Sequence, residues 1–419
     1  MILPKMHCIR QKLNPPVVAD VAAAVRAEID GLHLGDRLKP GARVAVTGGS
    51  RGVANIATIL KTTCECLTAL GAKPFIVPAM GSHGGATAEG QLKVLARYGV
   101  TPESMGVPIL SSMETVEIGR MSWGLPVVVD RNAYEADQIV LVNRVKPHTN
   151  FRAHVESGLM KMLVIGLGKH QGALLAHRAA VDVGLDRMVP EVARYSLSKL
   201  PILFGLGMLE NVRHQTARIK AMLPEALEEA EARLLKEAWT LLGRIPFEFL
   251  HLLIVDELGK EISGTGMDPN VIGRMYLAPN EEPKSPRYIR ILVRDLTEKT
   301  AGNAVGMGLA DFSTRRLADK INFQYTYTNA LTGLSPMRSK MPIIFETDKD
   351  AIEGALKTIG LTEPPDAKVA RIKNTLDLES LYVSDALLPE VKERAELEIV
   401  SGPRPFEFTA QGDLVDGAF

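Results

Sequence analysis

The stretch Arg43-Val-Ala-Val-Thr-Gly-Gly-Ser-Arg-Gly52 decides the fold class. Its apolar start has the length and β-branched content of a buried strand, and a segment of helical period follows over residues 52–70. The glycine-rich turn between them, residues 48–52, stands at the carboxyl end of the strand and at the start of the helix. Because free backbone N–H groups at a helix start attract anions, the pattern predicts an anion-binding loop on an α/β sheet.

Similar strands and helices alternate on either side of this stretch. Strand-like apolar runs cover residues 74–78, 138–142 and 201–204, and segments of helical period cover residues 16–31, 87–99 and 172–198. This alternation is typical of βαβ units, which form a mainly parallel sheet flanked by helices. We therefore predict an α/β fold for the first part of the chain.

A charged helix is predicted over residues 223–242, and a second alternation follows it. Its strands are expected at 252–255, 289–293, 342–346 and 369–373, and its helices near 300–320 and 348–359. The 419 residues exceed the roughly 250–300 at which one hydrophobic core stops growing. We therefore expect two domains: a cofactor-binding catalytic domain of residues 1–240, and a smaller α/β domain of residues 241–419 that closes the substrate cleft. A return of the C-terminal tail to the first domain is left open.

Charge and cysteine content exclude several classes of function and location. Lys plus Arg equal Asp plus Glu at 49 each, so no net positive charge favours binding of nucleic acid or an anionic membrane. Cys8, Cys64 and Cys66 cannot all pair, which favours a reducing compartment. The start carries no secretory signal pattern, and no apolar run approaches about 18 residues. These features predict a cytoplasmic protein that binds a small molecule, and its oligomeric state stays open.

The turn at residues 48–52 also matches the pattern G-x-S-x-G, in which the serine is the nucleophile of a hydrolase. In such hydrolases an earlier strand and loop supply part of the oxyanion hole, whereas residues 43–47 are nearly the first strand of this chain. The anion-binding interpretation is therefore favoured, and a serine hydrolase that uses Ser50 remains an alternative. A third interpretation is a non-catalytic protein that binds a nucleotide or a metal ion.

Two histidines follow the ends of two predicted strands. His83 lies in the turn Gly81-Ser-His-Gly-Gly85, and His148 ends the segment Asn143-Arg-Val-Lys-Pro-His148. Since the carboxyl ends of parallel strands meet at one edge of a sheet, these imidazoles are candidates for an acid–base pair. His154 is a second candidate for the role of His148. A capping or solvent-exposed role is the simpler interpretation of each histidine taken alone.

One lysine stands within the apolar run Leu159-Met-Lys-Met-Leu-Val164. Lysine is rarely buried without a partner or a role, and burial favours the neutral amine, which can form covalent bonds. Lys161 is therefore a candidate nucleophile. The alternative is a lysine on an amphipathic element whose amine reaches solvent.

Taken together, these segments resemble the nickel-pincer lactate racemase family across most of the first 240 residues. The similar segments follow in order along the chain: Ser50-Arg51 resembles the family's Thr-Arg pair, Gly81-Ser-His83 its Gly-Thr-His turn, Pro147-His148 its Pro-His pair, Ser157-Gly-Leu-Met-Lys161 its cofactor-carrying segment, and His177 its nickel-binding histidine. The resemblance implies a racemase or epimerase that inverts the 2-carbon of a small 2-hydroxy acid.

The resemblance also implies a nickel-containing cofactor, pyridinium-3,5-bisthiocarboxylic acid mononucleotide, which separate enzymes synthesise. Lys161 would be its covalent tether and His177 the only protein ligand of nickel, a metal that accepts imidazole and sulfur in a square plane. The other cofactor-binding residues would be Gly49, Ser50, Ser157 and Gly158. Hydride would leave the 2-carbon for the cofactor and return to the other face, while His83 and His148 exchange the hydroxyl proton.

Two arginines are expected to bind the substrate. Arg51 belongs to the pair that resembles Thr-Arg, and Arg274 ends residues 263–274, which resemble the family's Asp-x-Asn loop. Where the family grips lactate with Gln and Lys, this chain has Gly273 and Tyr276. Because a guanidinium binds a carboxylate through two hydrogen bonds, we expect Arg274 to bind a hydroxy acid other than lactate.

Overall fold

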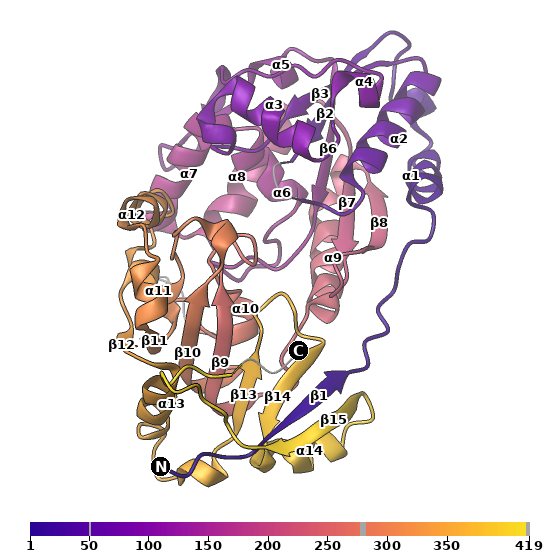
Figure 1. Ribbon diagram of the computed structural model, residues 1–419. Helices are drawn as coiled ribbons and strands as arrows, with labels where there is room; N and C mark the ends of the chain where they lie inside the picture. The colour runs from indigo at the N-terminus through magenta and orange to yellow at the C-terminus, as the bar shows by residue number, and fades with distance from the viewer. Residues whose placement is uncertain (50–51, 277–281, 416–419) are drawn as a thin grey trace. The chain divides into compact units, whose positions relative to one another are not determined.

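The computed structural model describes residues 1–49, 52–276 and 282–415. The chain forms two compact units: residues 15–242 make the larger unit, and residues 1–14 together with residues 243–419 make the smaller unit. Each unit combines a sheet rich in parallel strands with flanking helices, so the predicted α/β class is confirmed (Figure 1). The expected first domain started at residue 1, whereas residues 1–14 belong to the smaller unit.

The larger unit contains a five-stranded sheet and a separate two-stranded ribbon. Its strands are β2 (Arg43–Gly48), β3 (Lys73–Pro78), β4 (Thr115–Arg120), β5 (Pro126–Asp130), β6 (Gln138–Arg144), β7 (Ile202–Glu210) and β8 (Thr216–Met222). Its helices are α1 (Val21–Asp30), α2 (Ile56–Ala69), α3 (Ala88–Arg97), α4 (Pro102–Met105), α5 (Arg131–Tyr134), α6 (Leu159–Lys161), α7 (Lys169–Val183), α8 (Leu185–Lys199) and α9 (Leu227–Leu241).

The main sheet of the larger unit has the strand order β3-β2-β6-β7-β8, and its first four strands are parallel. Side chains alternate between its faces: Val44 and Val46 pack in the core that contains α1 and α2, whereas Ala45 packs in the core that contains α8 and α9. Both faces are therefore buried, as parallel sheets require. The carboxyl ends of β2, β3 and β6 lie at one edge of this sheet.

The smaller unit contains an eight-stranded mixed sheet. Its strands are β1 (Met6–Gln11), β9 (Phe249–Leu258), β10 (Arg287–Leu296), β11 (Phe312–Thr314), β12 (Ile343–Phe345), β13 (Val369–Ile372), β14 (Ser380–Ser384) and β15 (Leu397–Arg404). Its helices are α10 (Pro269–Ile272), α11 (Arg315–Asp319), α12 (Phe323–Thr332), α13 (Asp348–Leu356) and α14 (Leu388–Lys392). In the described parts of both units, no helix is long and apolar enough to cross a bilayer.

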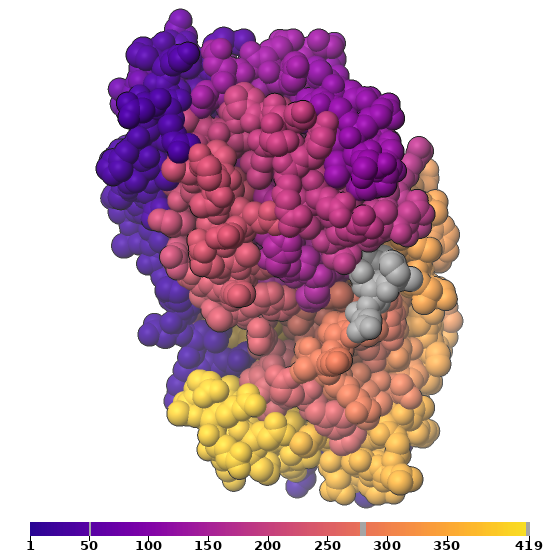
Figure 2. All heavy atoms as spheres, turned by 180° about the vertical axis from the view of Figure 1, so that it is seen from behind, coloured from indigo at the N-terminus to yellow at the C-terminus, as the bar shows by residue number. Residues whose placement is uncertain are grey.

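Strand β1 is the inner member of the antiparallel end of this sheet. The strand order is β12-β11-β10-β9-β13-β14-β1-β15, with parallel pairing from β12 to β13 and antiparallel pairing from there to β15. Cys8 on β1 lies opposite Tyr382 on β14 and Ser401 on β15. Residues 243–419 belong to this unit, and the C-terminal part of the chain is yellow in Figure 2. The C-terminal tail therefore completes the smaller unit.

Two expected helices differ from the observed structure, and glycines explain both differences. The helix expected near residues 300–320 is not present as one element: the range contains irregular turns, a 3-10 turn at residues 307–309 and strand β11, and only α11 is an α-helix. Gly302 and Gly306 have φ values of +78° and +104° there, which a right-handed helix excludes. The helix expected over residues 172–198 is instead two helices, α7 and α8, which meet at Gly184 with a φ of +78°.

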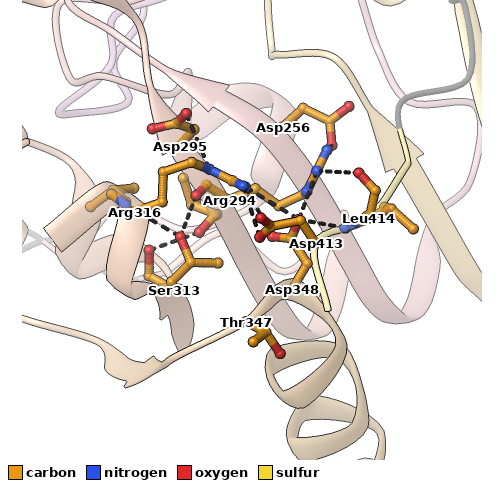
Figure 3. A network of polar contacts seen from close by, with 12 residues as sticks. Asp256, Arg294, Asp295, Ser313, Arg316, Thr347, Asp348, Asp413 and Leu414 are labelled. Atoms are coloured by element: carbon orange, nitrogen blue, oxygen red, sulfur yellow. Dashed lines mark hydrogen bonds and ion pairs between the residues drawn. The ribbon is translucent and has the colours of Figure 1, made fainter. Parts of the chain in front are cut away.

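A buried network of charged side chains joins four elements of the smaller unit (Figure 3). Arg294 on β10 lies between Asp256 on β9 and Asp348 at the start of α13, with N···O distances of 2.8 Å to each carboxylate. Arg316 on α11 pairs with Asp348 at 3.1 Å. Asp348 also accepts a hydrogen bond from the backbone N–H of Leu414 at 2.9 Å. The network therefore fixes the C-terminal segment to the sheet.

Replacement of Asp348 by alanine should lower the free energy of unfolding by about 3–5 kcal/mol, because two arginines and one N–H group lose a fully buried partner. Chemical denaturation measures this loss. Glu346→Ala is the control, since Glu346 pairs with Arg315 at an exposed position, and its loss should stay below about 1 kcal/mol. Equal losses in the two variants would contradict a stabilising role for the buried network.

Candidate active site

The carboxyl ends of β2, β3 and β6 and the segment after β6 line one pocket in the larger unit. The lining residues are Gly49, Val53, Ala79, Met80, His83, Asn143, Arg144, Lys146, Ser157, Lys161, Met162, Ile165 and Gly166. Among these described residues there are three Lys or Arg side chains and no Asp or Glu. The pocket therefore suits a ligand that carries negative charge.

Several residues that the sequence singled out gather at this pocket. Its wall contains Gly49, His83, Ser157 and Lys161. Gly158 follows Ser157 in the chain and begins α6, and His148 is bonded to Lys161. Ser50 and Arg51 lie outside the described residues. The structure thus brings six of the expected site positions to one pocket or its direct neighbours, while their roles stay predictions.

His148 and Lys161 are in direct contact. Nε2 of His148 lies 2.6 Å from Nζ of Lys161, and Nδ1 of His148 accepts a hydrogen bond from the N–H of Asn150 at 3.0 Å. A neutral imidazole that accepts at Nδ1 carries its proton on Nε2, so Nε2–H donates to Nζ. Since an ammonium group has no lone pair to accept this bond, the contact favours the neutral amine of Lys161. A neutral amine is a nucleophile.

His154 lies apart from the residues that line the pocket. It is exposed, and its Nε2 pairs with the carboxylate of Glu228, which also pairs with Arg194 at 2.7 Å. This placement favours His148 over His154 as the histidine that acts in the pocket.

The backbone around Lys161 departs from a regular helix. Lys161 ends the three-residue helix α6, and residues 162–166 then form a π-helical turn before α7 begins. Gly166 closes this turn: a Cβ atom there would lie 2.3 Å from Sδ of Met162 and 2.8 Å from the carbonyl oxygen of Ala79. Turns of the π type are rare and occur frequently at functional sites.

A buried carboxylate holds the backbone beside His148. Glu156 accepts hydrogen bonds from the N–H groups of His148 at 2.6 Å and Ala153 at 3.3 Å. Burial raises the pKa of Glu156 to about 7, although these hydrogen bonds and Arg152 oppose the increase. Glu156 therefore fixes the loop that carries His148.

A second buried carboxylate, Glu231 of α9, holds the segment that carries Lys161. It accepts hydrogen bonds from the N–H groups of Leu159 at 2.6 Å and Met160 at 3.0 Å. Burial raises the pKa of Glu231 to about 7. Glu231 is not among the predicted site residues, because residues 223–242 were predicted only as a charged helix. The signal was present: Glu231 is four residues from the buried Leu227 and falls on the apolar face of α9.

A series of buried polar side chains holds the backbone of the turn that carries His83. Nε2 of Gln91 donates to the carbonyl oxygens of Gly81 at 2.9 Å and His83 at 3.4 Å. Lys169 donates to Oε1 of Gln91 at 2.9 Å and pairs with Asp130 at 3.1 Å, and all three side chains are buried. These three side chains connect the His83 turn to α3, α7 and β5.

His177 lies on α7, within electrostatic range of Lys161. Burial lowers the pKa of the His177 imidazole. The imidazole is therefore neutral near pH 7, which is the form that binds metal ions. In the described parts of the chain, no three His, Cys, Asp or Glu side chains gather into a metal site.

Arg274 lies in the smaller unit and is engaged there. It pairs with Asp311 at 2.8 Å and donates to the carbonyl oxygens of Leu309, Tyr288 and Ile289 at 2.9–3.1 Å. These contacts link the turn after α10 to β10. They indicate a structural role, and the expected role of Arg274 in substrate binding finds no support in them.

Comparison with known proteins gives two similarities. The model of the lactate racemase N-terminal domain family matches residues 6–184, a range that contains every residue lining the pocket. Among solved structures, the chain resembles the lactate racemase apoprotein from Thermoanaerobacterium thermosaccharolyticum, with a TM-score of 0.50 and 13% sequence identity over 88% of this chain and 94% of that chain. At this identity the structural similarity concerns the fold. None of the curated proteins compared with the chain matches it.

Glu231→Gln should weaken the pH dependence of stability. The folded-state pKa of about 7 exceeds the ordinary value of 4.5, so the stability contributed by the protonated carboxyl is complete below about pH 4.5 and is lost as the pH rises through 7. Between pH 5 and pH 8 the decrease in unfolding free energy should therefore be smaller in the variant by roughly 1–3 kcal/mol. Urea denaturation at both pH values measures it. Glu229→Gln, exposed on the same helix, should behave like the wild type, and identical slopes in all three proteins would refute this source of pH dependence.

Proposed function

The chain is lactate racemase-like, and from this premise we propose that it is an isomerase that inverts the 2-carbon of a small 2-hydroxy acid. The observation that carries the proposal is the contact between His148 and Lys161 in a cationic pocket within the matched range. This contact supplies a neutral amine for a covalent tether beside an imidazole able to move a proton. A hydroxy acid is an anion, which agrees with the charge of the pocket.

Residues of the pocket, together with His177 on α7, fit a nickel-pincer nucleotide in three respects. The amine of Lys161 is neutral, as a covalent attachment requires. The imidazole of His177 is neutral and can hold nickel, whose remaining ligands would come from the cofactor. Arg144 and Lys146 supply positive charge for a nucleotide phosphate or a substrate carboxylate. When bound, such a cofactor supplies an acceptor for the hydride of the 2-carbon.

In the proposed reaction, two histidine side chains of the protein transfer the hydroxyl proton of the substrate. In the proposed reaction one histidine takes the hydroxyl proton of the substrate and the other returns it after inversion, so His83 and His148 act from different loops. To act as the base, His148 must turn Nε2 from Nζ of Lys161 to the substrate hydroxyl and give up the Nε2 proton. His83 acts from a turn whose backbone Gln91 holds in place.

Arg144 is positioned by a carboxylate of the neighbouring strand. Glu210 on β7 pairs with Arg144 on β6, and its other oxygen accepts the N–H of Ala54 at 2.7 Å. Glu210 thereby joins the end of β6 to the loop that precedes α2. We infer that Arg144 binds the anionic group of the ligand in a fixed orientation.

Lys161→Ala should abolish the covalent mass increment of protein produced together with the cofactor-synthesising enzymes, because the tethering amine is gone. Intact-mass measurement checks this result. Lys93→Ala, at an exposed position on α3, should keep the increment, and His177→Ala should keep the organic part while nickel, measured by elemental analysis, is lost. An unchanged increment in Lys161→Ala would rule out this residue as the tether.

Substrate deuterated at the 2-carbon should give inverted product that retains most of its deuterium, because hydride transfer in a closed site does not exchange with water. Mass spectrometry of the product, made by the loaded enzyme, measures the retention. His83→Ala should slow both directions equally, by roughly 10²–10⁴-fold, since the overall equilibrium constant is fixed. Exchange of most of the label with solvent would instead indicate proton abstraction at the 2-carbon and overturn the hydride mechanism.

A further inference from the structure

Glu231 is an unusual residue for the interior position that it occupies. Its side chain is fully buried, and its Oε1 atom has no hydrogen-bond partner among the described residues. An apolar side chain of similar size would fill this place on α9 without the cost of burying a carboxylate. The reason for a carboxylate at this position must therefore lie in the contacts of Oε2. This atom accepts hydrogen bonds from the N–H groups of Leu159 and Met160.

The carboxylate of Glu231 packs so closely against Gly158 that there is no room for a side chain at this position. A Cβ atom on Gly158 would lie 2.4 Å from Oε1 and 2.5 Å from the carboxyl carbon of Glu231. Any larger residue would therefore push the carboxylate away from the start of α6. The segment that carries Lys161 and the helix that carries Glu231 thus fit each other only with glycine at this position.

The turn that precedes Lys161 needs an external partner. Helix α6 has three residues, which is too short to offset the cost of helix nucleation, and the first N–H groups of a helix have no partner within it. No side chain caps α6 from its N-cap residue, Gly158. Glu231 supplies the missing acceptor for two successive N–H groups, and Lys161 is the next residue after Met160.

We propose that Glu231 is a positioning residue that fixes the turn before Lys161 and so keeps Nζ of Lys161 on Nε2 of His148. Glu231 acts through the backbone of Leu159 and Met160, and the contact that it maintains sets the neutral state of the amine. The proposal deepens the proposed function and rests on it for the role of Lys161. The contact itself involves neither nickel nor a hydroxy acid.

Trace acetylation of the full chain, made without the cofactor-synthesising enzymes, tests the proposal. Acetic anhydride at pH 7 reacts with neutral amines, and peptide mass spectrometry gives the ratio of acetylated Lys161 to acetylated Lys146, which lines the same pocket. Three variants disturb the turn: Glu231→Leu removes the acceptor, Glu231→Gln removes the charge, and Gly158→Ala displaces the carboxylate. Glu229→Gln is the matched control on the exposed face of α9.

The wild type should show a ratio above one. Glu231→Leu and Gly158→Ala should lower the ratio roughly tenfold, and Glu231→Gln should lower it less because its amide oxygen still accepts hydrogen bonds. Circular dichroism identifies the variants that fold, and a purely structural role would change their melting temperatures without changing the ratio. A wild-type ratio in the folded Leu and Ala variants would overturn the proposal, as would an equal fall in Glu229→Gln.

The acetylation ratio and a racemase assay of the loaded enzyme together distinguish a failure of this inference from a failure of the proposed function. If the ratio falls as expected while the loaded enzyme inverts no 2-hydroxy acid, the positioning role of Glu231 stands and the substrate assignment fails. If the loaded enzyme is an active racemase and the ratio is insensitive to Glu231 and Gly158, the substrate assignment stands and the positioning role is wrong.

Discussion

Parallel pairing of β2, β3 and β6 is the constraint on which the candidate active site depends. Parallel neighbours must be joined by crossovers, so each strand delivers its last residue to the same edge of the sheet. Gly49, His83 and the segment from His148 to Lys161 reach one pocket for this reason, although long stretches of sequence separate them. Burial of both sheet faces gives these loops a rigid base.

The loops themselves are held by buried polar groups. Gln91 and Lys169 fix the turn of His83, while Glu156 and Glu231 fix the segments of His148 and Lys161. Buried charges of this kind contribute little net stability, and apolar residues would often stabilise a fold more. Their placement around a single pocket indicates that they serve the geometry of the site. This is the exchange of stability for function that is common at active sites.

The sequence predicted those parts of the site that local patterns encode. The strand, turn and helix around Gly49 and the histidines after β3 and β6 follow from hydrophobic period and from the position of polar residues at strand ends. Glu231 was missed because its partners lie about seventy residues earlier in the chain and no local pattern connects them. The polar contacts of Arg274 could not be predicted for the same reason, since its carboxylate and carbonyl partners come from distant turns and strands. The missed β1 likewise pairs only with the far end of the chain.

The placement of β1 sets the order in which the two units can be completed during synthesis. Residues 15–242 form a continuous segment whose sheet needs no later residue, so this unit can fold while the ribosome is still making the rest. Strand β1 is made before the larger unit, yet its partners β14 and β15 are made after it. Until then its edges are unpaired, and closing the smaller sheet requires a loop of more than 360 residues between β1 and β14. Strand β1 is thus made before the larger unit but reaches its native pairing after it.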